Sequence, residues 1–149
     1  MGKVMTGTEY GSCSLLIYGD YLDFREIGER LGITATRIVE KGTPVLRSGS
    51  TSLGFCETNG WFYDVTYENQ SGFSTALGTL LSQIHPQKDR LKMLVETIES
   101  TNIFISVSVS SDYAQMSLEI GIEHQKLISE LGFPLRFSIL SFGRVENED

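Results

Sequence analysis

Residues 12–33 read SCSLLIYGDYLDFREIGERLGI, and this stretch predicts one strand followed by one helix. Over residues 12–19, Cys13, Leu15 and Ile17 alternate with Ser14, Leu16 and Tyr18, as in a well-buried strand. Asp23 then begins a helix, because its carboxylate can cap free amides and Glu26 stands three residues later, as a capping box requires. Gly32 ends this helix as a left-handed cap. A strand leading directly into a helix indicates mixed α and β structure.

The rest of the chain continues this mixture. Residues 102–110 form the clearest strand, with Ile and Val on one face and mainly Ser on the other, which indicates a sheet with one open side. Pro86 predicts a break between two helices with leucine-rich stripes. Further strands are expected at 35–40, 61–68 and 135–139, a helix at 123–131, and a returning hairpin strand at 115–120. We therefore expect an α+β fold in which helices pack on one face of an antiparallel sheet.

Two predicted helices end in a similar way. Residues 29–33 read ERLGI and residues 129–133 read SELGF, and each segment is followed by a β-prone stretch. This repetition predicts two βαβ-like halves, in a ferredoxin-like or split βαβ arrangement. The alternative is that a leucine, a glycine and an apolar residue are simply a common helix ending.

Composition restricts the class of protein. The chain has 149 residues, typical of one domain, and we expect a core over about 12–142 with flexible ends at 1–11 and 144–149. Its formal net charge is −7, without a cluster of Lys and Arg, which argues against binding to nucleic acid or an anionic membrane. There is no signal-peptide pattern and no membrane-length apolar run. These features predict a cytoplasmic protein with reduced thiols at Cys13 and Cys56.

Residues 42–60 form a long connection rich in Gly, Ser and Thr, which predicts either a ragged hairpin or a functional loop. This connection could bring Lys41 and Arg47 beside the aromatic strand that contains Trp61 and Tyr63. Arg and aromatic side chains are favoured anchors of binding surfaces, and the same group could hold a small anion. These four residues are the candidate binding site. The alternative, favoured by the one-sided alternation of the strand, is that both aromatic residues belong to the core and both cations face solvent.

The sequence predicts no catalytic residue, cofactor or metal ligand. It contains no Gly-x-Ser-x-Gly motif and no Gly-Lys-Ser/Thr phosphate loop. Its histidines and cysteines lie far apart, without zinc spacing. His85 is expected to bond helix-end carbonyls, His124 to be exposed, and Cys56 to be a plain surface thiol, because no spacing links it to a histidine. We therefore expect a protein that is not an enzyme.

An ordered series of short motifs resembles the bacterial domain-of-unknown-function 4279 family. The series runs from the strand that ends at Gly19, through the helix that ends at Gly32, to a strand that begins at Trp61. It continues with the helix end at 80–86 (LLSQIHP) and with a last helix that ends at Gly132. The resemblance covers about residues 12–142 and implies a small cytoplasmic bacterial domain. The family has no established catalytic residues, and some similar proteins are proposed to be immunity proteins that neutralise toxins by binding them.

The sequence favours a non-enzymatic protein-binding module, in particular a toxin-neutralising immunity protein with a basic toxin domain as partner. The acidic composition supports this interpretation, because complementary charge speeds association. The alternative is a small-molecule sensor or regulatory domain that uses the long connection and the Trp61 strand. A homodimer through the serine-rich face of the sheet, or through the edge of the sheet, also remains open.

Overall fold

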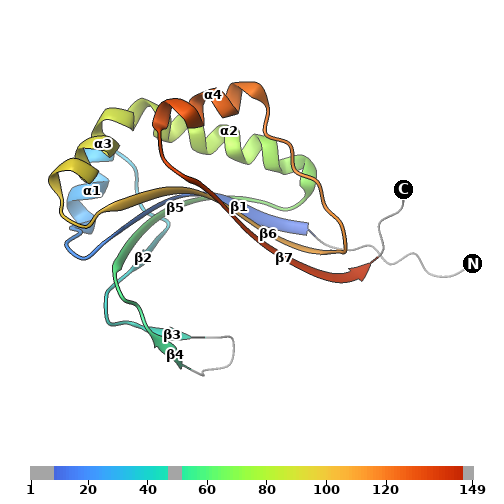
Figure 1. Cartoon of the computed structure of the whole chain (residues 1–149), viewed down its shortest axis with the longest axis horizontal. Coiled ribbons are helices and arrows are strands. Elements are labelled where there is room, and N and C mark those ends of the chain that lie inside the picture. Colours follow the sequence, from blue (N-terminus) through green and yellow to red (C-terminus); the bar gives the residue numbers. More distant parts are fainter. Residues whose placement is uncertain (1–8, 47–51, 146–149) are drawn as a thin grey trace, which may run out of the picture.

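One sheet carries the helices on a single side in the computed structural model, which describes residues 9–46 and 52–145 (Figure 1). The helices lie above this sheet, and a small hairpin lies below it. The strands of the sheet are β1 (Glu9–Gly19), β2 (Arg37–Val39), β5 (Asn59–Tyr67), β6 (Asn102–Tyr113) and β7 (Leu135–Val145). The helices are α1 (Phe24–Leu31), α2 (Phe73–Ile84), α3 (Lys88–Thr97) and α4 (Ile122–Leu131), with single 3-10 turns η1 (Gln70–Gly72) and η2 (His85–Gln87).

The strand order is β2-β5-β1-β6-β7. Strand β1 pairs antiparallel with both β5 and β6, and β5 pairs antiparallel with β2. The unit β1–α1–β2 is therefore a split βαβ unit, because β5 lies between its two parallel strands. The unit β5–α2–α3–β6 is a second one, with β1 between its strands. The fold is α+β with a ferredoxin-like arrangement, as the sequence predicted.

Strand β7 departs from the prediction of a wholly antiparallel sheet. It pairs parallel with β6, so the sheet is mixed. The physical reason is α4, which crosses the helix face and returns the chain to the sheet in the same direction as β6. The similar ends of α1 and α4 therefore do not mark two equivalent halves, since β6 and β7 are adjacent whereas β1 and β2 are separated by β5.

Local signals fix the helix ends. The Asp23 carboxylate accepts a hydrogen bond from the Glu26 amide at 3.1 Å and caps α1. Gly32 and Gly132 adopt left-handed conformations, with φ of 65° and 74°, directly after α1 and α4. Pro86 lies in η2, which separates α2 from α3 as predicted. These helix ends follow from residues close in sequence.

The core lies between the sheet and the helices. Its largest fully buried side chains include Trp61 of β5 and Phe73 of α2. Residues 115–120 form no strand, so the prediction of a returning hairpin strand there is wrong. The alternating apolar residues of that segment, Met116, Leu118 and Ile120, pack against the core instead of pairing with β6.

Residues 42–60 contain a hairpin, one of the two alternatives that the sequence left open. Its strands are β3 (Pro44–Leu46) and β4 (Ser52–Phe55), which pair antiparallel. The hairpin lies on the side of the sheet opposite to the helices (Figure 1). The chain between its strands, residues 47–51, lies outside the described residues.

Candidate binding face

The side of the sheet that faces away from the helices is called the open face. Strand register places side chains from five strands on it, because residues directly opposite in neighbouring strands point to the same side. This face contains a shallow hollow of about 520 Å³. The hollow is lined by Ser12, Ser14, Leu16, Tyr18, Arg37, Phe62, Asp64, Thr66, Ser106, Ser108 and Ser138.

Serine hydroxyls form the middle of the open face. Ser12 lies opposite Ser108, and Ser14 lies opposite Ser106, across β1 and β6. On the other side of β6, Ser138 of β7 lies opposite Ser108. The sheet therefore presents a row of small groups that can both donate and accept hydrogen bonds.

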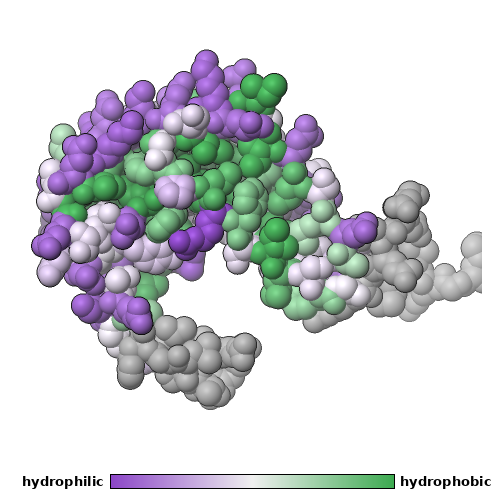
Figure 2. Space-filling view, viewed as in Figure 1, coloured by the Kyte–Doolittle hydropathy of each residue, from purple (hydrophilic) through white to green (hydrophobic). Residues whose placement is uncertain are grey.

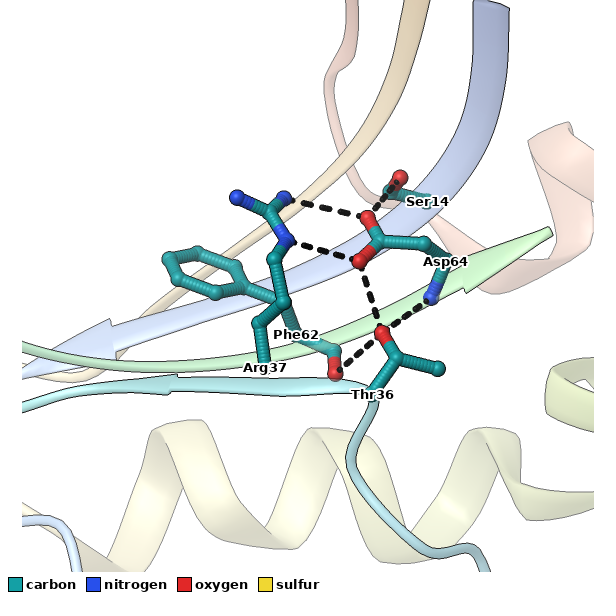
Figure 3. Close-up of polar contacts among 5 residues, drawn as sticks. All are labelled: Ser14, Thr36, Arg37, Phe62 and Asp64. Carbon is teal, nitrogen blue, oxygen red and sulfur yellow. Dashed lines mark hydrogen bonds and ion pairs between the residues drawn. The ribbon is translucent and has the colours of Figure 1, made fainter. Parts of the chain in front are cut away.

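Asp64 of β5 is the centre of a polar network at one side of the hollow (Figure 3). Arg37 donates to its carboxylate through Nε at 2.8 Å and Nη2 at 3.1 Å. Ser14 donates to it at 2.5 Å, and the Thr36 hydroxyl lies 2.6 Å from its second oxygen. The Asp64 amide also donates to the Thr36 hydroxyl at 2.9 Å. One side chain thus joins β5 to β1 and to the start of β2.

The network decides the charge state of Asp64. Burial raises the pKa of Asp64, but the hydrogen bonds from Arg37, Ser14 and Thr36 outweigh burial and lower the pKa to about 2. The same pairing raises the pKa of Arg37. Asp64 is therefore ionised at neutral pH, and its oxygens are occupied by donors. It is suited to hold Arg37 in place and unsuited to act as a general base.

Aromatic rings extend across the open face between two guanidinium groups. Arg37 lies over the Phe62 ring at 4.7 Å, and Arg136 of β7 lies over the Phe104 ring of β6 at 4.2 Å. Tyr18 of β1 makes edge contacts with both rings, at centroid distances of 5.4 and 6.2 Å. The two cations are therefore held against aromatic faces at opposite sides of the hollow. Among the described residues, no carboxylate forms an ion pair with Arg136.

The four residues of the predicted binding site do not form one group in the described structure. Trp61 is buried in the core, and Tyr63 is half-buried against it on the helix side of the sheet. Lys41 is exposed and forms an ion pair with Asp20 at 3.5 Å. Arg47 lies outside the described residues. Both aromatic residues occupy the places that the core alternative predicted, and binding through these four residues stays a prediction.

Sequence reasoning found the serine-rich face but missed its charged residues. Asp64 alternates with Tyr63 and Val65, so the pattern already placed it on the opposite side of β5 from the core. Nothing in the sequence links it to Arg37, because their contact depends on the pairing of β2 with β5. Arg136 reaches Phe104 only because β7 pairs parallel with β6.

The other chemistry-bearing residues lie away from this face. Burial raises the pKa of the Cys13 thiol to about 12, so this thiol is unreactive. His85 contacts Glu130 at 2.6 Å, which ties η2 to α4, rather than bonding helix-end carbonyls as predicted. His124 is half-buried near Gly78 of α2, so the prediction of an exposed side chain is wrong.

Within the part of the chain that the structure describes, no three His, Cys, Asp or Glu side chains are grouped so that they could hold a metal ion. None of the described helices has the length and apolar character needed to cross a bilayer.

No curated protein and no solved structure matches the chain. A family model described as a domain of unknown function, DUF4279, matches residues 8–142 and so includes every residue that lines the hollow of the open face. The match covers nearly the whole chain, and the chain belongs to the DUF4279 family.

Proposed function

We propose that this chain is a non-enzymatic protein-binding module that receives its partner on the open face. The observation that carries the proposal is the pair of guanidinium groups, each stacked on a phenyl ring, on either side of a serine-lined hollow. Arg, aromatic and Ser side chains are the typical composition of protein-recognition surfaces.

Preorganisation supports this function. Arg37 is fixed by two hydrogen bonds to Asp64 and by the Phe62 ring, so it loses little side-chain freedom when a partner binds. The lining of the hollow contains one carboxylate, Asp64. The hydrogen bonds that Asp64 accepts lower its pKa, so this carboxylate is not suited to take up a proton at neutral pH. These properties favour recognition over catalysis.

Charge indicates the chemistry of the partner surface. Around the hollow two guanidinium groups, Arg37 and Arg136, accompany the single carboxylate of its lining, Asp64, in a chain whose formal net charge is −7. The surface that meets this face should therefore present a carboxylate near Arg136. The acidic remainder of the chain attracts proteins that are basic overall. A toxin domain that is basic overall and contacts the open face through a carboxylate meets both conditions, and neutralisation of such a toxin is the proposed role.

A second candidate function is binding of a small organic anion as a sensor. The hollow of about 520 Å³ favours it, because small-molecule sites typically measure about 300–1,000 Å³. The same cation, Arg136, would hold the carboxylate of such a ligand.

Charge reversal at Arg136 tests the proposal. The partner is first identified by cross-linking in the organism that encodes the chain, and its affinity is then measured with purified proteins by titration calorimetry. Arg136→Glu should weaken binding at least tenfold, because a guanidinium stacked on an aromatic ring is a typical hot spot and the substitution reverses its charge. Arg90→Glu is the matched control on α3, outside the open face, and should change the affinity less than twofold.

Three results decide between the functions. A tenfold loss restricted to Arg136→Glu supports protein binding at the open face. Equal affinities for both variants and the wild type would exclude the open face as the contact surface. If no protein partner is found, but an organic anion raises the melting temperature of the wild type and not of Arg136→Glu, the sensor function replaces the proposal.

A further inference from the structure

Strand β7 is the long edge of the sheet. It spans eleven residues, Leu135–Val145, and pairs with β6 on one side, while no described strand pairs with its other side. The opposite edge, β2, has only three residues. Exposed strand edges attract further strands, and soluble proteins usually shorten or charge them. The β2 edge is short, whereas the β7 edge is long.

The exposed side chains of β7 are apolar on both faces of the sheet. Phe137 and Ile139, on the helix side, are 45% and 57% exposed, and Leu140, on the open face, is 54% exposed. Figure 2 shows the helix layer coloured mainly as hydrophilic and a band of hydrophobic colour across the face of the molecule that carries β7. Strand β7 contains two charged residues, Arg136, whose side chain stacks on Phe104, and Arg144 near the end of the strand. Between them, residues 137–143 contain no charge of the kind that normally blocks strand addition.

We infer that a second copy of this chain pairs with β7, edge to edge and antiparallel, across a two-fold axis. The two five-stranded sheets then form one continuous sheet. The contact is isologous, because the β7 edge that no described strand covers in one copy pairs with the same edge of the other copy. The assembly closes at two copies, since only the short β2 edges of the main sheet remain outside.

Backbone geometry supports this pairing. The Ile105 amide donates to the Pro134 carbonyl, so the backbone groups of even-numbered residues at the start of β7 point towards β6. Alternation along a strand then directs the amides and carbonyls of Phe137 and Ile139 to the open edge. These are the groups that a second β7 strand would bond.

One register between the two β7 strands gives the most favourable side-chain pairs. A two-fold axis at Ser138 places Phe137 of each copy opposite Ile139 of the other, which gives two pairs of an aromatic and a β-branched side chain. The same register places Arg136 opposite Leu140, so the two Arg136 side chains do not face each other. A shift of the axis to Ile139 would place Phe137 opposite Ser141 and lose both apolar pairs.

The contact area is typical of a weak dimer. With roughly 100 Å² exposed on each of the three apolar side chains and a paired segment of about 24 Å, residues 135–141 of each copy, the dimer buries on the order of 800 Å², at the low end for protein interfaces. An interface of this size is expected to be reversible, and so to depend on protein concentration.

Sedimentation of the full chain tests the dimer. The wild type should sediment as a dimer at high micromolar concentration, and Ile139→Lys should raise the dissociation constant at least tenfold, because it places two lysines within one apolar cluster. Ile122→Lys is the matched control, since Ile122 is 80% exposed on α4 and away from the edge. A wild type that stays monomeric, or a dimer that resists Ile139→Lys, overturns the inference.

Cross-linking tests the register. Cysteines at position 138 would lie at the two-fold axis with Cα atoms about 4.5 Å apart, a distance that allows a disulfide. In a Cys56→Ser background, Ser138→Cys should form a covalent dimer on oxidation. Leu140→Cys should not, because its two copies are separated by about 13 Å along the strands. Equal cross-linking of both variants, or of neither, overturns the register.

Discussion

Asp64 holds three strands of the open face together through one carboxylate. Its partners are Ser14 on β1, Arg37 on β2 and Thr36 immediately before β2. The Asp64 side chain is only 11% exposed, whereas Arg37 is 59% exposed, so an uncharged amide at position 64 would lose the charge-assisted hydrogen bonds from Arg37 without leaving a buried charge. The attachment of β2, the shortest strand of the sheet, therefore depends on this ionised group in addition to its three residue pairs with β5.

The pH dependence of Asp64→Asn tests this role. The pKa of Asp64 falls from an ordinary 3.8 to about 2 in the fold, which corresponds to roughly 2 kcal/mol of stability at neutral pH. Because the pKa is lowered, this contribution is complete above about pH 4 and is lost as the pH falls towards 2. Urea unfolding of the wild type and Asp64→Asn should therefore differ by roughly 2 kcal/mol at pH 7 and converge at acidic pH.

Glu29→Gln is the control for Asp64→Asn. Glu29 forms an exposed ion pair with Arg25 within α1, and such pairs contribute little to stability. Its loss should leave the free energy of unfolding nearly unchanged at every pH. A difference between wild type and Asp64→Asn that stays constant from pH 7 to pH 2 would show that the lost contact is not ionic.

Strands β1 and β6 approach closely at Gly11. A Cβ atom at this position would overlap the Ser108 carbonyl oxygen and lie 2.6 Å from the Tyr67 hydroxyl. Gly11→Ala should therefore lower the free energy of unfolding by about 2 kcal/mol or more, because backbone atoms of a central strand must move. Gly121→Ala is the matched control, since no atom lies within 4 Å of the added methyl group. Thermal unfolding of both variants measures the difference, and equal melting temperatures would contradict the predicted overlap.

The elements show which parts of the structure the sequence could predict. Alternation identified β1, β5 and β6, and the signals at Asp23, Gly32 and Pro86 identified helix ends, because each depends on residues close in sequence. Alternation did not predict the parallel pairing of β7 or the coil at 115–120, because both depend on where α4 crosses the sheet.

The candidate site was predictable only in part, because its contacts join residues that are distant in sequence. The pattern along β5 separates Trp61 from Asp64, but it does not say which side the helices cover. The contact between Arg37 and Asp64 spans 27 positions, and the contact between Arg136 and Phe104 spans two strands. Sequence reasoning therefore proposed the Trp61 and Tyr63 side of β5 for binding, whereas Arg37 and Arg136 lie on the other side of the sheet, at its two edges.

Sheet order makes a prediction for the whole molecule. Strand β1 is paired on both sides over most of its length, so its amides should exchange with solvent only on global unfolding. Strand β2 is held by three residue pairs, and its amides should exchange by local opening. Hydrogen exchange resolved by residue should therefore give the highest protection at Cys13 and Leu15 and low protection at Ile38. Comparable protection at Ile38 and Leu15 would mean that the sheet opens as a single unit.

The same measurement separates the monomer from the proposed dimer. The amides of Phe137 and Ile139 point to the open edge of β7, where no described strand pairs with them, so they should exchange rapidly in the monomer. Pairing with a second copy would protect both amides, and this protection should rise with protein concentration while that of β1 stays constant. Ile139→Lys should abolish the concentration dependence at Phe137. Protection at Phe137 that does not vary with concentration would instead indicate that another part of the same chain covers the edge.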